Sequence, residues 1–302
     1  MTYEELWRRL VPLYDVGEAK AIVRWLLDVR FGLTLADILC GRAAELSASE
    51  QRELKQMTDR LAEGEPVQYV AGLADFCGRQ LHVGPGVLIP RPETAELCQW
   101  ILEERGRRSE EGGTRSEERG RRKEEGEYSD AVSILDIGTG SGCIAITLAV
   151  ELPGARVSGW DISEAALAIA RQNAEHLGGS VSFEQRDILD ASLFALHSSL
   201  YDTIVSNPPY IEPAERQGME KNVLDYEPDI ALFAPEDHPT IFYERIADYA
   251  INALRPGGHL FFELNPLTAD SVADYLRQKG FRQIQIRQDS QGKDRLLKAT
   301  KI

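Results

Sequence analysis

The second half of the chain alternates between short apolar runs and longer segments with helical periodicity. This alternation is typical of α/β proteins, in which helices cover both faces of a mostly parallel sheet. The predicted strands span residues 132–136, 156–160, 181–184, 201–206, 259–263, 284–287 and 295–298. The last two would pair antiparallel across residues 289–294. The pattern therefore predicts a doubly wound sheet with a C-terminal antiparallel hairpin over residues 131–302.

The first third of the chain has a different pattern. Residues 3–63 show helical periodicity with few β-branched runs, and Ser47–Glu50 has the sequence of a capping box that opens a helix. We therefore expect a small helical bundle over residues 1–64. From residue 67 to about residue 94 the pattern becomes strand-like. It predicts a hairpin linker, which together with the start of the α/β domain would occupy residues 65–102.

Residues 103–130 form a charged segment with a near-repeat. Residues 103–112 almost recur as residues 117–126, and the segment holds ten acidic and eight basic residues. It has no apolar stripe to bury, so we expect a flexible or frayed-helical insert. Its net charge is only −2, so the acidity of the chain belongs to the folded parts.

Composition and charge narrow the range of functions. The chain has 302 residues, enough for a sizeable core and two domains. Its net charge of −15 argues against a broad phosphate-binding surface, although a local basic cleft stays open. No apolar run is long enough to span a bilayer, and the acidic N-terminus lacks a signal-peptide pattern. The four cysteines are scattered, which favours reduced thiols in the cytoplasm, and no histidine has metal-ligand spacing, so we expect no metal.

Four candidate functional loops follow four successive predicted strands. The first is rich in glycine, which allows a tight turn and a close approach to a ligand; it consists of Gly138, Thr139, Gly140, Ser141 and Gly142. Asp161 ends the second strand, in the usual place for a carboxylate that binds ribose hydroxyls. The third strand leads to Asp187 and Ile188, where an adenine ring would lie. Taken singly, the glycine loop could be a simple turn or an NAD site, and Asp161 and Asp187 could be helix caps or turn carboxylates.

The fourth loop carries the most informative residues, which are Asn207, Pro208, Pro209 and Tyr210. A residue before proline favours an extended conformation, and proline has no N–H. The loop can therefore present the Asn207 amide and the Pro208 carbonyl as two fixed acceptors. They suit a planar nitrogen with two hydrogens to donate, either a side-chain amide or the exocyclic amine of a base.

In this order, the four loops resemble those of class I S-adenosylmethionine-dependent methyltransferases. Other segments are similar to the HemK-like family of peptide chain release factor glutamine methyltransferases, namely residues 65–72, 87–94, 226–228 and 292–295. The resemblance runs through most of the chain except residues 103–130. Residues 87–94 are the most specific mark, because adenine methyltransferases share the sequence Asn-Pro-Pro-Tyr.

The resemblance implies a Rossmann-like fold and a cytoplasmic enzyme that uses S-adenosyl-L-methionine. Its substrate would be the glutamine amide nitrogen in the Gly-Gly-Gln motif of peptide chain release factors. Residues 207–210 would be catalytic and, with Arg91, would bind substrate. The glycine loop, Asp161, Asp187, Ile188 and Asn207 would bind cofactor. The helical bundle would dock the protein substrate, with no direct nucleic acid or membrane partner.

Three observations keep alternatives open. Adenine also offers an NH₂ group, so a DNA or RNA adenine methyltransferase is the competing enzyme, and a non-catalytic scaffold that binds a translation factor is the competing class. Ile188 stands where the family commonly has an aromatic residue, and Arg186 where a small or polar residue is usual. Arg91 could also form an ordinary surface salt bridge.

Overall fold

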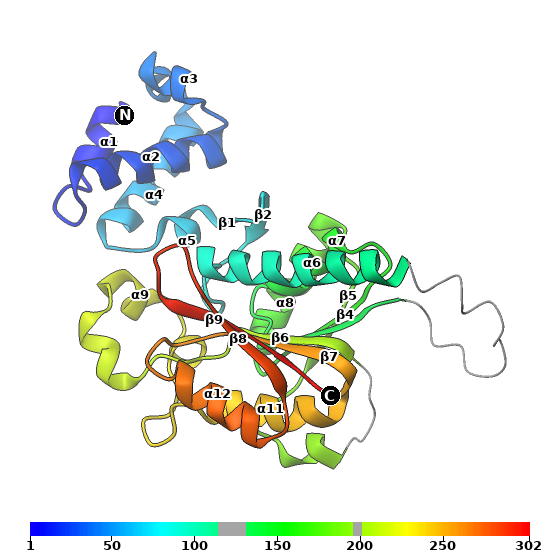
Figure 1. Cartoon of the computed structure of the whole chain (residues 1–302). Helices are drawn as coiled ribbons and strands as arrows, with labels where there is room; N and C mark the ends of the chain where they lie inside the picture. Colours follow the sequence, from blue (N-terminus) through cyan, green and yellow to red (C-terminus); the bar gives the residue numbers. More distant parts are fainter. Residues whose placement is uncertain (114–130, 196–200) are drawn as a thin grey trace.

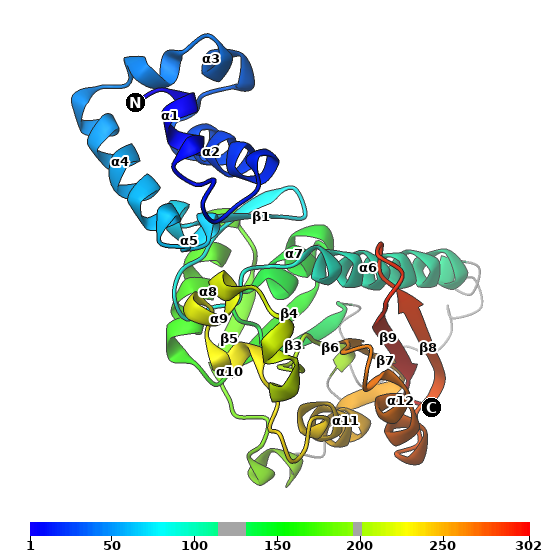
Figure 2. The ribbon, with the colours of Figure 1, turned by 90° about the vertical axis from the view of Figure 1, so that its left-hand side faces the viewer.

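The computed structural model describes residues 1–113, 131–195 and 201–302. Its first part is the expected helical bundle, drawn in blue and cyan in Figures 1 and 2. The helices are α1 (Tyr3–Arg8), α2 (Val16–Phe31), α3 (Leu35–Leu39), the 3-10 helix η1 (Arg42–Glu45), α4 (Ala48–Ala62) and α5 (Val67–Ala71). The predicted capping box opens α4, because Ser47 Oγ accepts from Glu50 N and the Glu50 carboxylate accepts from Ser47 N. Fully buried leucines, including Leu26, Leu27 and Leu54, form the core of this bundle.

The linker after the bundle contains fewer strand residues than its sequence predicts. Residues 67–71 form α5 rather than a strand, because Pro66 caps the start of a helical turn and Gly72 ends it in a left-handed conformation. The hairpin consists of β1 (Leu73–Phe76) and β2 (Arg79–His82), and residues 87–89 belong to no strand. Asn173 fixes the hairpin to the α/β domain, since its side chain hydrogen-bonds both the N–H and the carbonyl of His82.

The α/β domain is built on a sheet of seven strands, as the alternating pattern predicts. The strands are β3 (Ser133–Ile137), β4 (Arg156–Asp161), β5 (Val181–Gln185), β6 (Tyr201–Ser206), β7 (Leu254–Glu263), β8 (Arg282–Gln288) and β9 (Asp294–Thr300). Their order is β5-β4-β3-β6-β7-β9-β8. The first five are parallel to one another, and β9 pairs antiparallel with both β7 and β8. The predicted doubly wound sheet with its terminal hairpin is confirmed, although β7 begins earlier than expected.

Helices cover both faces of this sheet (Figures 1 and 2). One face packs on α6 (Pro92–Gly113), α7 (Cys143–Glu151) and α8 (Glu164–Leu177), and the other on α11 (Ile241–Ala253) and α12 (Ala269–Gln278). Side chains alternate between the faces along each strand, so Val205 lies in one core while Ile204 lies in the other. Shorter helices complete the loops: η2 (Ala191–Ala195), η3 (Pro213–Gly218), α9 (Lys221–Tyr226) and α10 (Asp229–Leu232).

The beginning of the predicted charged insert belongs to α6, which continues to Gly113. Polar contacts connect this stretch to the sheet: Glu103 pairs with Arg287 at 3.2 Å, and Glu104 pairs with Lys298 at 2.9 Å. Sequence pattern missed these contacts because they join charges far apart along the chain. Residues 114–130 of the predicted insert lie outside the described residues.

Candidate methyl-transfer site

A cavity of about 270 Å³ opens at the carboxyl ends of β3, β4, β5 and β6. This is where ligands bind in open α/β sheets. Ten of the predicted site residues line it, which are Gly138, Thr139, Gly140, Ser141, Asp161, Asp187, Ile188, Asn207, Pro208 and Pro209. Residues Gly86, Val87, Leu88 and Pro90 of the linker add a further wall. The structure therefore brings the four predicted loops together around one space.

Backbone hydrogen bonds attach the glycine loop to the neighbouring strand β4. The N–H groups of Gly138 and Thr139 donate to the carbonyl of Trp160 at 2.8 and 2.9 Å. Gly140 has a φ of 54°, and no atom lies within 4 Å of where a side chain would begin. Gly142 does not line the cavity; a Cβ there would lie 2.8 Å from Ile146, so this glycine permits the contact between α7 and its neighbours.

Asp136 stabilises the glycine loop through hydrogen bonds. It was not among the site residues predicted from the sequence. One carboxylate oxygen accepts from Thr139 Oγ1 at 2.6 Å and from Ala145 N at 3.2 Å. The side chain is fully buried, and burial raises its pKa to about 7. An acidic residue at the end of a mostly apolar predicted strand was the sequence feature that could have indicated this role.

Asp161 faces the cavity rather than capping α8. Ser163 is the N-cap, since its hydroxyl accepts from Ala166 N, so the helix-cap interpretation of Asp161 is wrong. The Asp161 carboxylate accepts from Gly140 N at 2.8 Å and from Ser163 N at 2.9 Å. Burial raises its pKa above the ordinary value. These bonds orient a carboxylate that still has lone pairs for ligand hydroxyls.

Asp187 and Ile188 form another part of the cavity wall. Asp187 is also a turn carboxylate, because it accepts from Leu189 N at 2.9 Å. Arg186 lines the same cavity and pairs with Glu184 at 2.8 Å. Sequence reasoning treated Arg186 only as a departure, whereas the structure makes it a lining residue.

Asn207 lies between this cavity and a second one of about 200 Å³. Arg91, Tyr210 and Asn207 all line the second cavity, with Met219 and Val223 from the loop that follows. The predicted residues thus divide into two groups that share Asn207. A donor and an acceptor bound in adjoining cavities would meet at this side chain.

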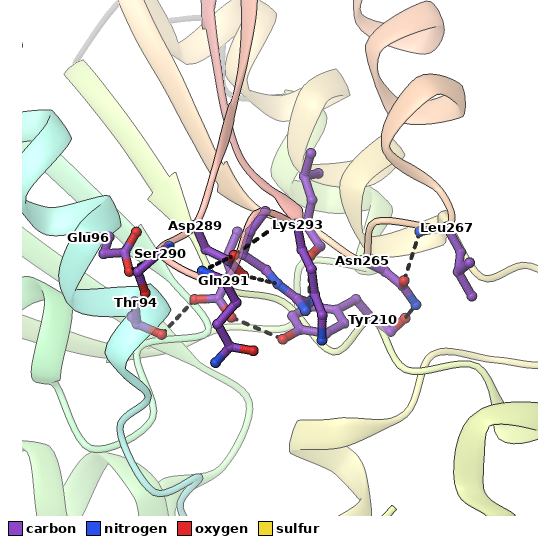
Figure 3. A network of polar contacts seen from close by, with 12 residues as sticks. Thr94, Glu96, Tyr210, Asn265, Leu267, Asp289, Ser290, Gln291 and Lys293 are labelled. Atoms are coloured by element: carbon purple, nitrogen blue, oxygen red, sulfur yellow. Dashed lines mark hydrogen bonds and ion pairs between the residues drawn. The ribbon is translucent and has the colours of Figure 1, made fainter. Parts of the chain in front are cut away.

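A hydrogen-bonded chain runs behind Asn207. Its Nδ2 donates to Thr94 Oγ1 at 3.1 Å, and the Thr94 hydroxyl donates to Glu263 at 2.6 Å. The Tyr210 hydroxyl donates to the other oxygen of the same carboxylate at 3.0 Å (Figure 3). Burial raises the pKa of Glu263 and of Tyr210, so the phenol stays protonated. Neither Thr94 nor Glu263 was assigned a role from the sequence.

Arg91 is paired, but its partner is not on the surface. Its guanidinium contacts Glu227, whose side chain is 1% exposed, and Glu227 also accepts from Ile89 N at 3.1 Å. Glu227 thereby joins the linker to the loop after Tyr210. Glu227 lies in residues 226–228, a segment that is similar to the family, and this similarity was the sequence feature that could have indicated its role.

Among the residues that the structure describes, no three His, Cys, Asp or Glu side chains gather in a way that could hold a metal ion. None of the described helices is long and apolar enough to cross a membrane.

Comparison with known proteins gives two family matches. Residues 128–280 match the family described as "Methyltransferase domain", and residues 7–72 match the family described as "PrmC N-terminal domain". These two matches cover most of the α/β domain, without β8 and β9, and most of the helical bundle.

Curated relatives match almost the whole chain. The release factor glutamine methyltransferase of Bacteroides thetaiotaomicron is 43% identical over 97% of this chain and 96% of its own length. Its counterparts in Flavobacterium psychrophilum and Chlorobaculum tepidum are 33% and 39% identical, over 96% and 93% of this chain and 94% and 90% of their own lengths. Among solved structures, a T. thermophilus 16S rRNA N2 G1207 methyltransferase in complex with AdoMet and guanosine matches with a TM-score of 0.48 and 21% identity, over 76% of this chain and 50% of that one.

Proposed function

Because this chain belongs to the release factor glutamine methyltransferases, we infer that it methylates a glutamine of peptide chain release factors. The reaction adds a methyl group to the side-chain amide nitrogen in the Gly-Gly-Gln motif. S-adenosyl-L-methionine is the methyl donor, and when bound it supplies an activated sulfonium methyl group. A relative that is 43% identical over 97% of the chain is named a release factor glutamine methyltransferase, which supports this proposal.

We propose that the first cavity holds the cofactor. The residues present there fit it. The open backbone at Gly140 admits a ligand, and the Asp161 carboxylate is oriented to accept hydrogen bonds from ribose hydroxyls. Asp187 and Ile188 would bound the adenine ring, and Arg186 would lie at the edge of the same cavity.

The second cavity would receive the glutamine side chain. The observation that supports this best is that Asn207 lines both cavities, so an acceptor nitrogen there would lie next to the cofactor. Tyr210 would pack against the substrate as a neutral ring. Arg91 would act from the wall of the cavity, where Glu227 fixes its guanidinium.

The chemistry of the loop follows from the amide group of glutamine. Its nitrogen is a poor nucleophile, because the lone pair is delocalised into the carbonyl. Asn207 Oδ1 and the Pro208 carbonyl would each accept one hydrogen of the NH₂ group. This increases electron density on the nitrogen and holds it at the reacting distance, which is about 3–3.5 Å. Orientation and exclusion of water would supply most of the rate gain. The loop needs no strong base, because the nitrogen becomes acidic once methylated and then releases one proton through these hydrogen bonds to solvent.

The helical bundle of residues 1–64 would dock the release factor, and residues 65–102 would connect it to the catalytic part. Residues 131–302 would form the cofactor-dependent domain, with α6 reaching into the predicted insert of residues 103–130. We place the enzyme in the cytoplasm, where translation termination occurs, without a direct nucleic acid or membrane partner. The net charge of −15 supports the first of these exclusions.

A methyl-transfer assay with radiolabelled S-adenosylmethionine separates this function from the alternatives. The protein is incubated with a release factor and, separately, with DNA. We expect label on the release factor and none on DNA. Label on DNA alone would favour an adenine methyltransferase, and no transfer to either would favour a non-catalytic scaffold.

A further inference from the structure

Three chain segments beside Asn207 share one buried carboxylate. Glu263 is the last residue of β7 and is 1% exposed. It accepts a hydrogen bond from Thr94, in the first turn of α6, and another from Tyr210, at the end of the proposed methyl-transfer loop. Figure 3 shows Thr94 and Tyr210 approaching from opposite sides, with a dashed line from each.

The donor and acceptor of each hydrogen bond from Asn207 through Thr94 to Glu263 follow from the number of hydrogens available. The Thr94 hydroxyl has one hydrogen, and the Glu263 carboxylate takes it at 2.6 Å. Only lone pairs of Thr94 Oγ1 remain for Asn207, so Asn207 must turn its NH₂ group toward Thr94, at 3.1 Å. The reverse amide orientation would set two acceptors against each other. The amide oxygen of Asn207 is therefore the atom left for the substrate.

In its ionised form, Glu263 makes this assignment one-sided. A carboxylate accepts from two hydroxyls at once, whereas a glutamine at the same position has one oxygen and one NH₂ group. With glutamine there, one of the two hydroxyls would have to accept, and its own hydrogen would be free to turn elsewhere. The Thr94 hydrogen could then point at Asn207 and stabilise the wrong amide orientation. The backbone of Glu263 is itself fixed, because Tyr243 donates to its carbonyl at 3.0 Å.

We propose that Thr94 and Glu263 are positioning residues that fix the amide orientation of Asn207. They present its oxygen, rather than its NH₂ group, to the NH₂ group of the glutamine. A flipped amide would set donor against donor and leave the substrate nitrogen without one of its two acceptors. This inference rests on the proposed role of Asn207 and adds the residues that make the role possible.

The test compares two substitutions at Thr94. Thr94→Val removes the hydroxyl and keeps the shape of the side chain, whereas Thr94→Ser keeps the hydroxyl and removes a methyl group. Methylation of an intact release factor is measured at steady state, and cofactor affinity is measured by calorimetry. We expect Thr94→Val to lower kcat about tenfold, the loss of roughly one hydrogen bond, with KM unchanged. Because Thr94 also lines the first cavity, the loss of cofactor affinity should be smaller than the loss of kcat. Thr94→Ser should keep the wild-type kcat.

Thr147→Val is the matched control, because Thr147 is also a buried threonine of the catalytic part but lies on α7. It should keep the wild-type kcat. If Thr94 served only packing, the order would reverse, with valine active and serine slow. That result, or equal activity of both variants and the wild type, would overturn the proposal.

A double-mutant cycle with Asn207→Ala separates failure of this proposal from failure of the proposed function. If Thr94 acts through Asn207, Thr94→Val should cause no further loss once the amide is gone. Equal fold-losses in both backgrounds would mean that Thr94 acts independently of Asn207. Full activity of Asn207→Ala itself would instead remove the proposed role of the loop. If Asn207→Ala is slow and Thr94→Val is fully active, only the proposed positioning role of Thr94 is refuted.

Discussion

Arg91 and Glu227 form an ion pair of 2.5 Å across 136 residues of sequence. The pair joins the linker to the loop that follows the proposed methyl-transfer residues, and Arg91 lines the second cavity. Glu227 is buried, so its charge depends on Arg91 and on the N–H of Ile89 for compensation.

Removing the Arg91 side chain should therefore destabilise the protein. Arg91→Ala leaves a buried carboxylate without its cation, which should cost about 1–3 kcal/mol in the free energy of unfolding, measured by urea denaturation. Arg171→Ala is the control, because the Arg171–Glu164 pair is about half exposed on both sides. That pair should be worth about 0–1 kcal/mol. Equal losses in the two variants would show that the Arg91 pair has no special structural role.

The Asp161 carboxylate should determine cofactor affinity. Asp161→Ala removes an acceptor for the ribose hydroxyls and should weaken binding by roughly 1.5–3 kcal/mol, as expected for hydrogen bonds to a charged group. Titration calorimetry measures this directly. Ser47→Ala is the control, because it removes the cap of α4 in the helical bundle and should lower thermal stability without changing affinity. An unchanged affinity in Asp161→Ala would refute the ribose assignment.

Much of this site could be predicted from the sequence, because it depends on local patterns. Each loop follows an apolar strand, and parallel strands bring their carboxyl ends to one edge. The contacts of Thr94 and Glu263 could not be predicted, since they join residues that are distant in sequence and depend on side-chain packing. The same reason explains why the sequence left open an ordinary surface salt bridge for Arg91, whose partner Glu227 is buried. Residues 67–71 were assigned to a strand-like segment, but they form the short helix α5 between Pro66 and Gly72. In so short a run, β propensity is a weak guide.

The buried Asp136 should give the protein a measurable pH dependence of stability. Its folded pKa of about 7 lies above the ordinary value of 3.8, so the native state holds a proton that the unfolded state has released. The contribution of Asp136 to the free energy of unfolding is fully present below the pKa of the unfolded state. It is lost as the pH rises through the pKa of the folded state. Between these values, the free energy of unfolding should fall by up to about 1.4 kcal/mol per pH unit.

Asp136→Asn removes this titration while nearly keeping the side-chain shape. Urea denaturation from about pH 5 to about pH 8 should show the wild type losing stability relative to the variant as pH rises. Other carboxyl groups titrate in both proteins and cancel in the difference. Parallel curves would mean that Asp136 is not protonated in the native state near neutral pH.

The helical bundle should matter for protein substrates and much less for small ones. A protein that begins at Glu65 should still bind cofactor, because the first cavity is lined only by residues from Gly86 onward. It should lose methylation of an intact release factor more than methylation of a short glutamine peptide, when kcat/KM is compared for both. Equal losses on the two substrates would indicate that the bundle only stabilises the catalytic part.

Asn207 lines both cavities. Of the two proposed acceptors, only its side-chain oxygen can be removed by substitution, because the other is the backbone carbonyl of Pro208. Asn207→Ala should lower turnover by about 10²–10³-fold, by analogy with deleting one preorganised polar contact, and should affect cofactor affinity much less. Asn207→Asp keeps an acceptor oxygen and should retain more activity than Asn207→Ala.

The most direct test is mass spectrometry of a release factor after incubation with S-adenosylmethionine and either the wild-type protein or Asn207→Ala. The wild type should add one methyl group, on the glutamine of the Gly-Gly-Gln motif, and Asn207→Ala should leave that glutamine almost unmodified over the same time. A methyl group at another residue, or full modification by Asn207→Ala, would contradict the proposed site.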